Sequence, residues 1–98
     1  MKLEEIFKVL NNENRLLFLN WLKNPESFFP EQQEPFTTGV CVGQIQKKSS
    51  KTFSTVSEHL SLLQQAGLLT STKKGKWIYY KRNEQRIAEI TRMIKENL

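Results

Sequence analysis

The stretch STVSEHLSLLQQAGLLTSTKKGKWIYYKR, residues 54–82, decides the fold of this chain, and its first half has the pattern of a helix. Val56, Leu60 and Leu63 recur at intervals of three and four residues, which places them on one face of a helix. Hydroxyl side chains and one carboxylate occupy the opposite face. Gly67 follows at a position where helices commonly end. The sequence therefore predicts an amphipathic helix with a hydroxyl-rich outer surface.

The second half of the stretch has the pattern of a β-hairpin. Thr, Trp, Ile and Tyr, which favour strands, are frequent over residues 68–73 and 76–82, and Lys74-Gly75 lies between the two runs. Basic side chains concentrate around this turn. A hydroxyl-bearing helix followed by a lysine-rich hairpin is typical of a winged helix-turn-helix, in which the helix fits a DNA groove and the hairpin reaches the phosphate backbone.

Apolar periodicity and capping residues predict the remaining helices. With the helix already described, over about residues 53–66, they cover about residues 3–10, 12–22, 40–48 and 83–98. Asn12 and Thr52 are placed to act as N-caps. In the second helix the side chains available for burial are Leu16, Leu17, Leu19 and Trp21. We expect a mainly α fold with a small β-hairpin wing (α+β), in the order α-α-α-α-β-β-α.

Residues 24–38 interrupt this pattern with three prolines, three phenylalanines and no convincing period. Connections in small domains are usually about 4 to 6 residues long. We expect an ordered loop, inserted into one domain that spans residues 1–98, whose aromatic side chains pack on that domain.

Positive charge gathers in the middle of the chain. The net charge of +5 divides into −2 over residues 1–36 (4 basic, 6 acidic), +7 over 37–82 (8 basic, 1 acidic) and 0 over 83–98 (3 of each). A basic patch confined to one segment is typical of nucleic-acid binding, because neutralised phosphates release counterions. The alternative is a lysine-rich hairpin that only aids solubility.

Composition limits the other classes of protein. No apolar run approaches the roughly 20 residues of a membrane helix, the first residues are acidic where a signal peptide is basic, and one cysteine cannot form an internal disulfide. We therefore expect a cytoplasmic protein. One Cys, one His, no Asp and no glycine-rich phosphate loop leave too little for an active site, so we expect no enzyme and no cofactor.

The terminal helix carries an apolar stripe that needs a partner. The first helix, a second subunit or both are candidates, and the last arrangement gives a two-fold dimer through the first and last helices. Two recognition helices would then lie about 34 Å apart and read a palindrome. The residues predicted for this interface are Leu3, Ile6, Phe7, Leu10, Ile87, Ile90 and Ile94.

The residues predicted to contact DNA come from the helix-turn-helix and the hairpin. They are Lys47, Lys48, Lys51, Thr52, Ser54, Thr55, Ser57, Glu58, His59, Ser61, Lys73, Lys74 and Lys76. Glu58 can accept a hydrogen bond from cytosine N4. His59 has two interpretations: a packed histidine that steadies the helix, or a base or phosphate contact. Phe53 is expected to point into the core.

Four motifs resemble the ArsR/SmtB-type winged-helix repressors over nearly the whole chain outside the loop. They are Asn-Arg-Leu at 14–16, GVCVGQI at 39–45, STVSEHLSLLQQAGLL at 54–69 and GKWIYYKR at 75–82. The resemblance implies a dimer through first and last helices, DNA reading by the helix-turn-helix, and release of DNA by an inducer.

The chain departs from the family's metal-binding pattern. GVCVGQI is similar to the ELCVCDL metal box, but Gly43 and Gln44 stand where the resemblance implies the second cysteine and the aspartate. The terminal helix, where the family's other common site places His and Asp or Glu, contains no His. We therefore expect no ordinary metal site; an atypical one would need carboxylates such as Glu31 and Glu34.

Several inducers and one other function stay open. Cys41 is either a small buried side chain or a thiol sensor that oxidation or persulfidation alters. A small organic molecule in a pocket lined by the loop aromatics is a further candidate inducer. A winged-helix protein-interaction module that docks a partner on Phe28-Phe29-Pro30 is the alternative to DNA binding.

Overall fold

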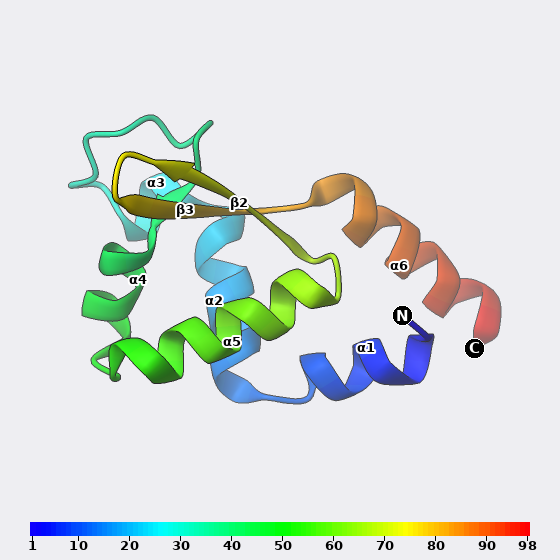
Figure 1. The fold of residues 1–98 in the computed structure, drawn as a ribbon. Coiled ribbons are helices and arrows are strands. Elements are labelled where there is room, and N and C mark those ends of the chain that lie inside the picture. Colours follow the sequence, from blue (N-terminus) through cyan, green and yellow to red (C-terminus); the bar gives the residue numbers. More distant parts are fainter.

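A computed structural model describes residues 1–98 as six helices and three strands (Figure 1). In chain order these are α1 (Leu3–Leu10), α2 (Glu13–Lys23), α3 (Pro25–Phe28), β1 (Val40–Cys41), α4 (Val42–Ser49), α5 (Phe53–Gln65), β2 (Leu69–Lys74), β3 (Trp77–Arg82) and α6 (Glu84–Asn97). The predicted winged helix-turn-helix is confirmed. Its element order differs from the prediction by the one-turn helix α3 and the short strand β1.

The first two helices begin and end close to their predicted limits. Asn12 caps α2, since its side-chain oxygen accepts hydrogen bonds from the backbone N–H groups of Asn14 and Arg15. The predicted buried face of α2 is wrong in part. Leu16 and Leu17 are 51% and 41% exposed, and the helix instead buries the face that carries its aromatic residues, with Phe18 fully enclosed.

The segment predicted as the start of the third helix is a strand. Val40 and Cys41 pair with the open edge of β3, opposite Tyr80 and Tyr79, and the sheet order is β1-β3-β2. Gly39 makes this approach possible: its φ is +112°, and a Cβ there would lie 2.7 Å from the carbonyl oxygen of Tyr80. The helix α4 therefore begins two residues later than predicted.

The helix α5 is capped at both ends as the sequence predicts. The backbone N–H of Thr55 donates to the hydroxyl of Thr52 at the N-terminus. At the C-terminus Gly67 has φ +80° and donates to Gln64, while Leu68 donates to Leu63, which is the Schellman pattern. The predicted burial of Phe53 is wrong: the ring is 49% exposed, because the first turn of α5 projects beyond the core.

Residues 24–38 are ordered by a helical turn and by aromatic packing. The turn, α3, begins at Pro25, which suits the first position of a helix; this part of the segment was predicted as loop. Phe29 is buried, and Phe28 and Phe36 pack against the core while half-buried. The prediction that the aromatics pack is confirmed.

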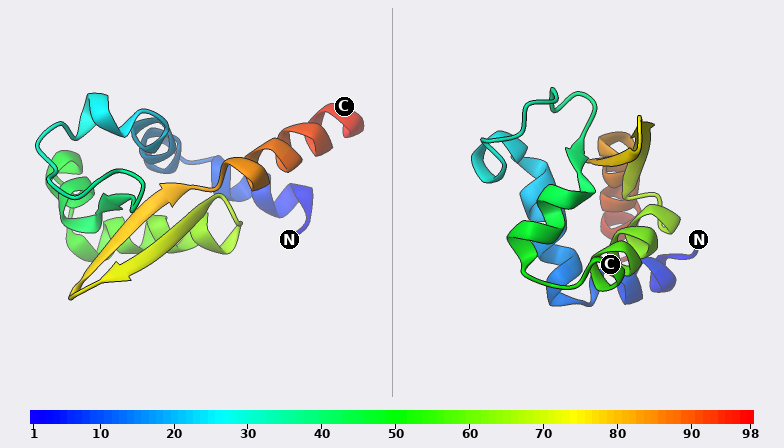
Figure 2. Two further views of the ribbon diagram at one scale, coloured as in Figure 1. Left: turned by 90° about the horizontal axis from the view of Figure 1, so that it is seen from above. Right: turned by 60° about the vertical axis from the view of Figure 1, so that its left-hand side comes forward.

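Seventeen buried side chains form one hydrophobic cluster that draws on α1, α2, α4, α5, α6 and the sheet. The molecule is elongated, with extents of 41 × 25 × 23 Å. Both chain ends lie at one end of it, where α1 and α6 project together, and the wing extends from the opposite part of the body (Figures 1 and 2). No helix has the length and apolar composition that crossing a membrane requires.

Candidate nucleic-acid interface

The outer face of α5 presents the predicted base-reading side chains together. Ser54, Thr55, Glu58 and Ser61 are exposed and Ser57 is half-buried, whereas Val56, Leu60 and Leu63 on the opposite face are fully buried. Buried branched side chains therefore fix the rotation of the helix. The exposed face has short side chains of the kind that approach base edges closely.

The turn before α5 also holds its polar groups in place. The Thr52 hydroxyl, which caps α5, lies 2.9 Å from the Thr55 hydroxyl. The amide of Gln46 donates to the Lys51 carbonyl, and Ser50 closes α4 in the left-handed region with φ +58°. The ammonium of Lys51 is free of any protein carboxylate. This turn leaves one cation beside the first turn of α5.

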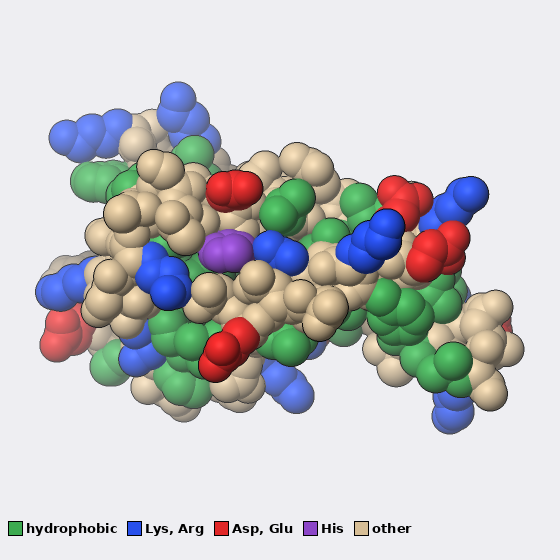
Figure 3. All heavy atoms as spheres, turned by 90° about the horizontal axis from the view of Figure 1, so that it is seen from below, with side chains coloured by type: hydrophobic (Ala, Val, Ile, Leu, Met, Phe, Trp, Pro, Cys, Tyr) green, Lys and Arg blue, Asp and Glu red, His purple; other side chains and the backbone are tan.

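His59 is a packed, hydrogen-bonded side chain at the edge of this face. The guanidinium of Arg15 lies 3.1 Å from Nδ1, and because Arg only donates, Nδ1 accepts and the ring proton resides on Nε2. Phe18 meets the imidazole edge-on. Burial, with the Arg15 charge second, lowers the pKa of His59 below 6.5, and so favours the neutral ring. The ring is visible at the surface, with basic side chains and one acidic side chain close to it (Figure 3).

Arg15 connects three helices and is a site residue that the sequence prediction omitted. Besides His59 on α5, it donates from Nε to the Val9 carbonyl at 2.6 Å and from Nη2 to the Lys8 carbonyl at 3.5 Å, both in the last turn of α1. The last carbonyls of α1 gain a cationic donor, which suits a helix C-terminus. The only sequence signal for this role is the Asn-Arg-Leu motif.

The three lysines at the tip of the wing differ in the partners that they contact. All are exposed, but Lys74 forms an ion pair with Glu34 of the inserted loop, and Lys76 lies 5.8 Å from the ring centroid of its neighbour Trp77. The Glu34 contact raises the pKa of Lys74 and, in turn, lowers the pKa of Glu34. Lys73 has no protein acceptor. Lys73 and Lys76 are therefore open to a phosphate, whereas Lys74 already has an anionic partner.

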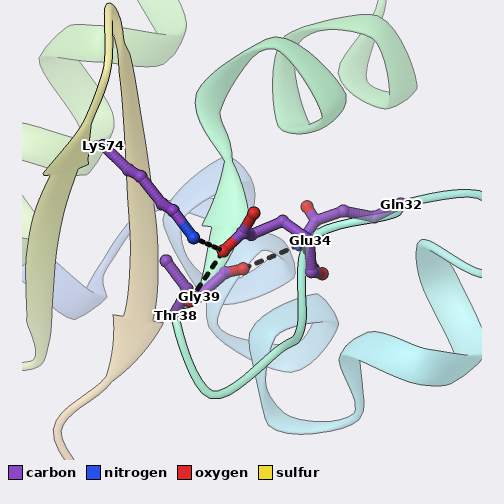
Figure 4. Close-up of polar contacts among 5 residues, drawn as sticks. All are labelled: Gln32, Glu34, Thr38, Gly39 and Lys74. Atoms are coloured by element: carbon purple, nitrogen blue, oxygen red, sulfur yellow. Dashed lines mark hydrogen bonds and ion pairs between the residues drawn. The ribbon is translucent and has the colours of Figure 1, made fainter.

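The inserted loop is tied to the wing by polar contacts that the sequence did not predict (Figure 4). Gln32 donates to the carbonyls of Glu34 and Gly39 and accepts from the N–H of Cys41, which closes the loop upon itself. The hydroxyl of Thr38 donates to Glu34. Lys81 of β3 donates to the carbonyl of Thr37. Glu34, considered from sequence only as an atypical metal ligand, is the loop's contact to the wing tip.

Lys47 and Lys48 lie apart from the hydroxyl face of α5. Both line a depression between α4 and the α3 segment, and the ammonium of Lys48 lies over the rings of Trp21 and Phe28, at 5.4 and 5.5 Å from their centroids. Their predicted DNA contact would therefore need phosphates on the α3 side of α4.

Cys41 is half-buried at the junction of β1 and α4. Its backbone N–H donates to Gln32. No group of three His, Cys or acidic side chains lies close enough together to hold a metal ion. The sensor role of Cys41 stays a prediction.

The residues predicted for the dimer interface divide by burial. Ile6 and Ile90 are 0% and 3% exposed, so they belong to the core of the chain itself. Phe7 is 40% exposed. The half-buried members are Leu3, Leu10, Ile87 and Ile94. Hydrophobic side chains gather at the surface of this end of the molecule (Figure 3).

Comparison with known proteins agrees with this arrangement. No family model matches the chain. The HTH-type transcriptional regulator YbzH of Bacillus subtilis is 42% identical over 96 residues, covering 96% of both chains. The arsenical resistance operon repressor of Escherichia coli is 31% identical over 79% of this chain and 56% of its own length. The structure of HlyU from Vibrio cholerae N16961 matches the fold with a TM-score of 0.63 at 22% identity, covering 93% of this chain and 86% of that one. The chain belongs to the ArsR/SmtB-type family of winged-helix transcriptional regulators.

Proposed function

We propose that this regulator works as a homodimeric repressor that binds a palindromic operator and releases it when an inducer binds. The observation that carries the proposal is the outer face of α5, where exposed hydroxyls and one carboxylate share a surface that the buried face holds in a fixed orientation. The net charge of +7 over residues 37–82 favours a phosphate backbone beside this surface.

We assign base contacts to Ser54, Thr55 and Glu58 and phosphate contacts to Lys51, Lys73 and Lys76. The side chains on α5 are short, exposed and on one face, which suits a major groove. The three lysines have no carboxylate partner within the chain. Phosphate contacts by the lysines would set the register in which α5 meets the bases.

The α1 and α6 end supports the dimer. These two helices project from the body, and Phe7 together with half-buried leucines and isoleucines leaves an apolar surface there. A two-fold axis at this end would cover that surface and leave both copies of α5 free. Two α5 helices one DNA turn apart would read a palindrome.

The test is retardation of a DNA fragment from the chain's own promoter by the full protein, over a series of salt concentrations. Lys73→Gln should make the salt slope shallower by about 0.9 per protomer, because one phosphate contact is lost. Lys95→Gln removes the same charge from an exposed position of α6 and should leave the slope unchanged. Light scattering should give the mass of a dimer at micromolar concentration. A monomer, or a protein indifferent to DNA at low salt, contradicts the proposal.

A further inference from the structure

The depression beside α4 has the size and lining of a small-molecule site. Its volume is about 300 Å³, at the lower end of the range for ligand pockets. Phe28, Phe29 and Pro30 form one wall from the inserted loop. Gln44, Lys47 and Lys48 form the other wall from α4, and Glu31 lies at the rim. An apolar wall therefore faces a polar, basic wall.

The charge of the lining favours an anion. The chain's ion pairs use Lys74, Arg82 and Arg86, so neither Lys47 nor Lys48 has a carboxylate partner. Lys48 is held against Trp21 and Phe28, whose rings attract a cation without neutralising it. Two lysines against Glu31 leave an excess of one positive charge, which matches one negative charge on a ligand.

The basic wall belongs to the helix-turn-helix. Val42 and Ile45, on the inner face of α4, are buried in the core cluster that also contains Val56 and Leu60 of α5. Gln44, Lys47 and Lys48 are on the outer face of the same eight-residue helix. A ligand bound between α3 and α4 would therefore contact the helix on which α5 packs, and a displacement of α4 would change the position of α5.

We propose that this pocket binds a flat organic monoanion, with its apolar body against Phe28 and Phe29 and its carboxylate at Lys48 and Lys47. Gln44 and Glu31 are placed to meet a polar substituent on the body. The further step, that the bound anion weakens DNA binding, rests on the proposed repressor function and identifies the class of its inducer.

The probe is 1-naphthoate, with 1-naphthamide as its neutral isostere. The readout is the pair of indole N–H resonances in a two-dimensional NMR spectrum of the full chain. Trp21 contacts Lys48 and Phe29 beside the pocket, whereas Trp77 lies on the wing, and Figure 2 places the wing and α3 on opposite sides of the molecule. We expect naphthoate to shift the Trp21 signal saturably, with a Kd on the order of 1 mM, and to leave the Trp77 signal in place.

The variants separate a built site from weak surface attraction. Lys48→Met keeps the aliphatic stem on the rings and removes the charge, so it should weaken naphthoate binding at least about tenfold, the lower end of the effect of losing a charged hydrogen bond. Lys95→Met makes the same change on α6 and should bind as the wild type does. Three outcomes would contradict the proposed binding site. They are equal affinity for naphthoate and naphthamide, an equal loss of affinity in the two variants, and no shift of the Trp21 signal at naphthoate concentrations up to about 10 mM.

DNA retardation with saturating naphthoate tests the coupling. We expect naphthoate to lower the DNA affinity of the wild type and to change the DNA affinity of Lys48→Met only slightly. If naphthoate binds the pocket and DNA affinity stays the same, the inducer assignment is wrong while the binding site stands. If the wild type binds no DNA at all, the repressor function fails, and the NMR titration still decides the pocket.

Discussion

The recognition helix α5 and the β2–β3 wing belong to the same predicted DNA-binding surface, but the chain holds them in different ways. Val56, Leu60 and Leu63 of α5 are completely buried. In the wing, by contrast, only Leu69 and Tyr80 are buried, and every β2 residue after Leu69 is exposed. The loop contacts to the wing are exposed polar contacts made by Lys74 and Lys81.

The difference indicates a division of roles. Each buried apolar side chain contributes kilocalories per mole to the free energy of unfolding, so the orientation of α5 is fixed once the core has folded. Exposed ion pairs contribute little and weaken with salt, so the wing tip is free to adapt to the backbone of a duplex. Perturbing the buried face of α5 should therefore lower stability, whereas perturbing the exposed tip of the wing should change only DNA affinity.

The largest effect is expected from Leu60→Ala, at a fully buried position of α5. The cavity and the lost transfer free energy should lower the free energy of unfolding by about 2–5 kcal/mol. Urea denaturation followed by circular dichroism measures this. Ser61→Ala, at the exposed neighbouring position, should change stability by less than about 0.5 kcal/mol. Equal effects at the two positions would remove the contrast between the faces of α5.

A smaller loss is expected from Arg15→Met, which keeps the stem and removes the donors. The Val9 carbonyl and the Nδ1 atom of His59 would lose their partner, at a cost of about 1–3 kcal/mol in the free energy of unfolding. This contact is the one polar link from α1 to α5, so its loss should also loosen α5 relative to the end of the molecule formed by α1 and α6. A variant as stable as the wild type would show that solvent replaces Arg15.

The pH dependence of stability provides the control for that variant. The folded protein holds the pKa of His59 below 6.5, so the unfolded chain binds more protons in the window between the two values. The contribution of His59 to stability is fully present above pH 6.5 and is lost as pH falls through the folded pKa. Arg15→Met removes one cause of the lowered pKa, so its loss of stability towards acid pH should be shallower. His59→Gln should lack the contribution of His59 to the pH dependence of stability.

The exposed ring of Phe53 is expected to contact a DNA base directly. This ring is 49% exposed at the start of α5, beside Ser54 and Thr55, where an apolar side chain can contact a thymine methyl group. In an operator selected from random DNA, replacing thymine by deoxyuracil should weaken wild-type binding by about 0.8 kcal/mol, roughly fourfold, at the contacted position. Phe53→Ala should not distinguish the two bases. Indifference of the wild type at every thymine would leave the exposed ring without this role.

The parts of the fold that sequence reasoning predicted well are those specified by local signals. The cap at Asn12, the cap at Thr52 and the glycine at position 67 each act within a few residues, and the helices they bound lie close to the predicted limits. The apolar spacing in α5 likewise identified its buried face. Local hydrogen bonds and helical periodicity are visible in a single sequence.

The errors lie where a distant segment decides the local structure. Val40 and Cys41 form a strand because the edge of β3 is open to them, and Leu16 and Leu17 are exposed because the core accepts Phe18 on another face of α2. Phe53 fits helical periodicity, yet no part of the fold extends far enough to cover it. The pairing of Glu34 with Lys74 spans 40 residues, and no local pattern predicts it.

That pairing gives the smallest effect and the sharpest test of the wing's freedom. With Glu34 bound to Lys74, a phosphate must displace a carboxylate before it gains that lysine. Glu34→Gln should leave Lys74 available, so the salt slope of operator binding should steepen by up to about 0.9 per protomer, with tighter binding at low salt. Glu31→Gln removes the same charge from the same loop without touching the wing and serves as the control. If the two variants change the slope equally, the effect is only that of net charge. If only Glu34→Gln changes the slope, the inserted loop limits how strongly the wing binds the DNA backbone. The orientation of α5 should not change in this variant, because the Glu34–Lys74 ion pair lies entirely outside the core.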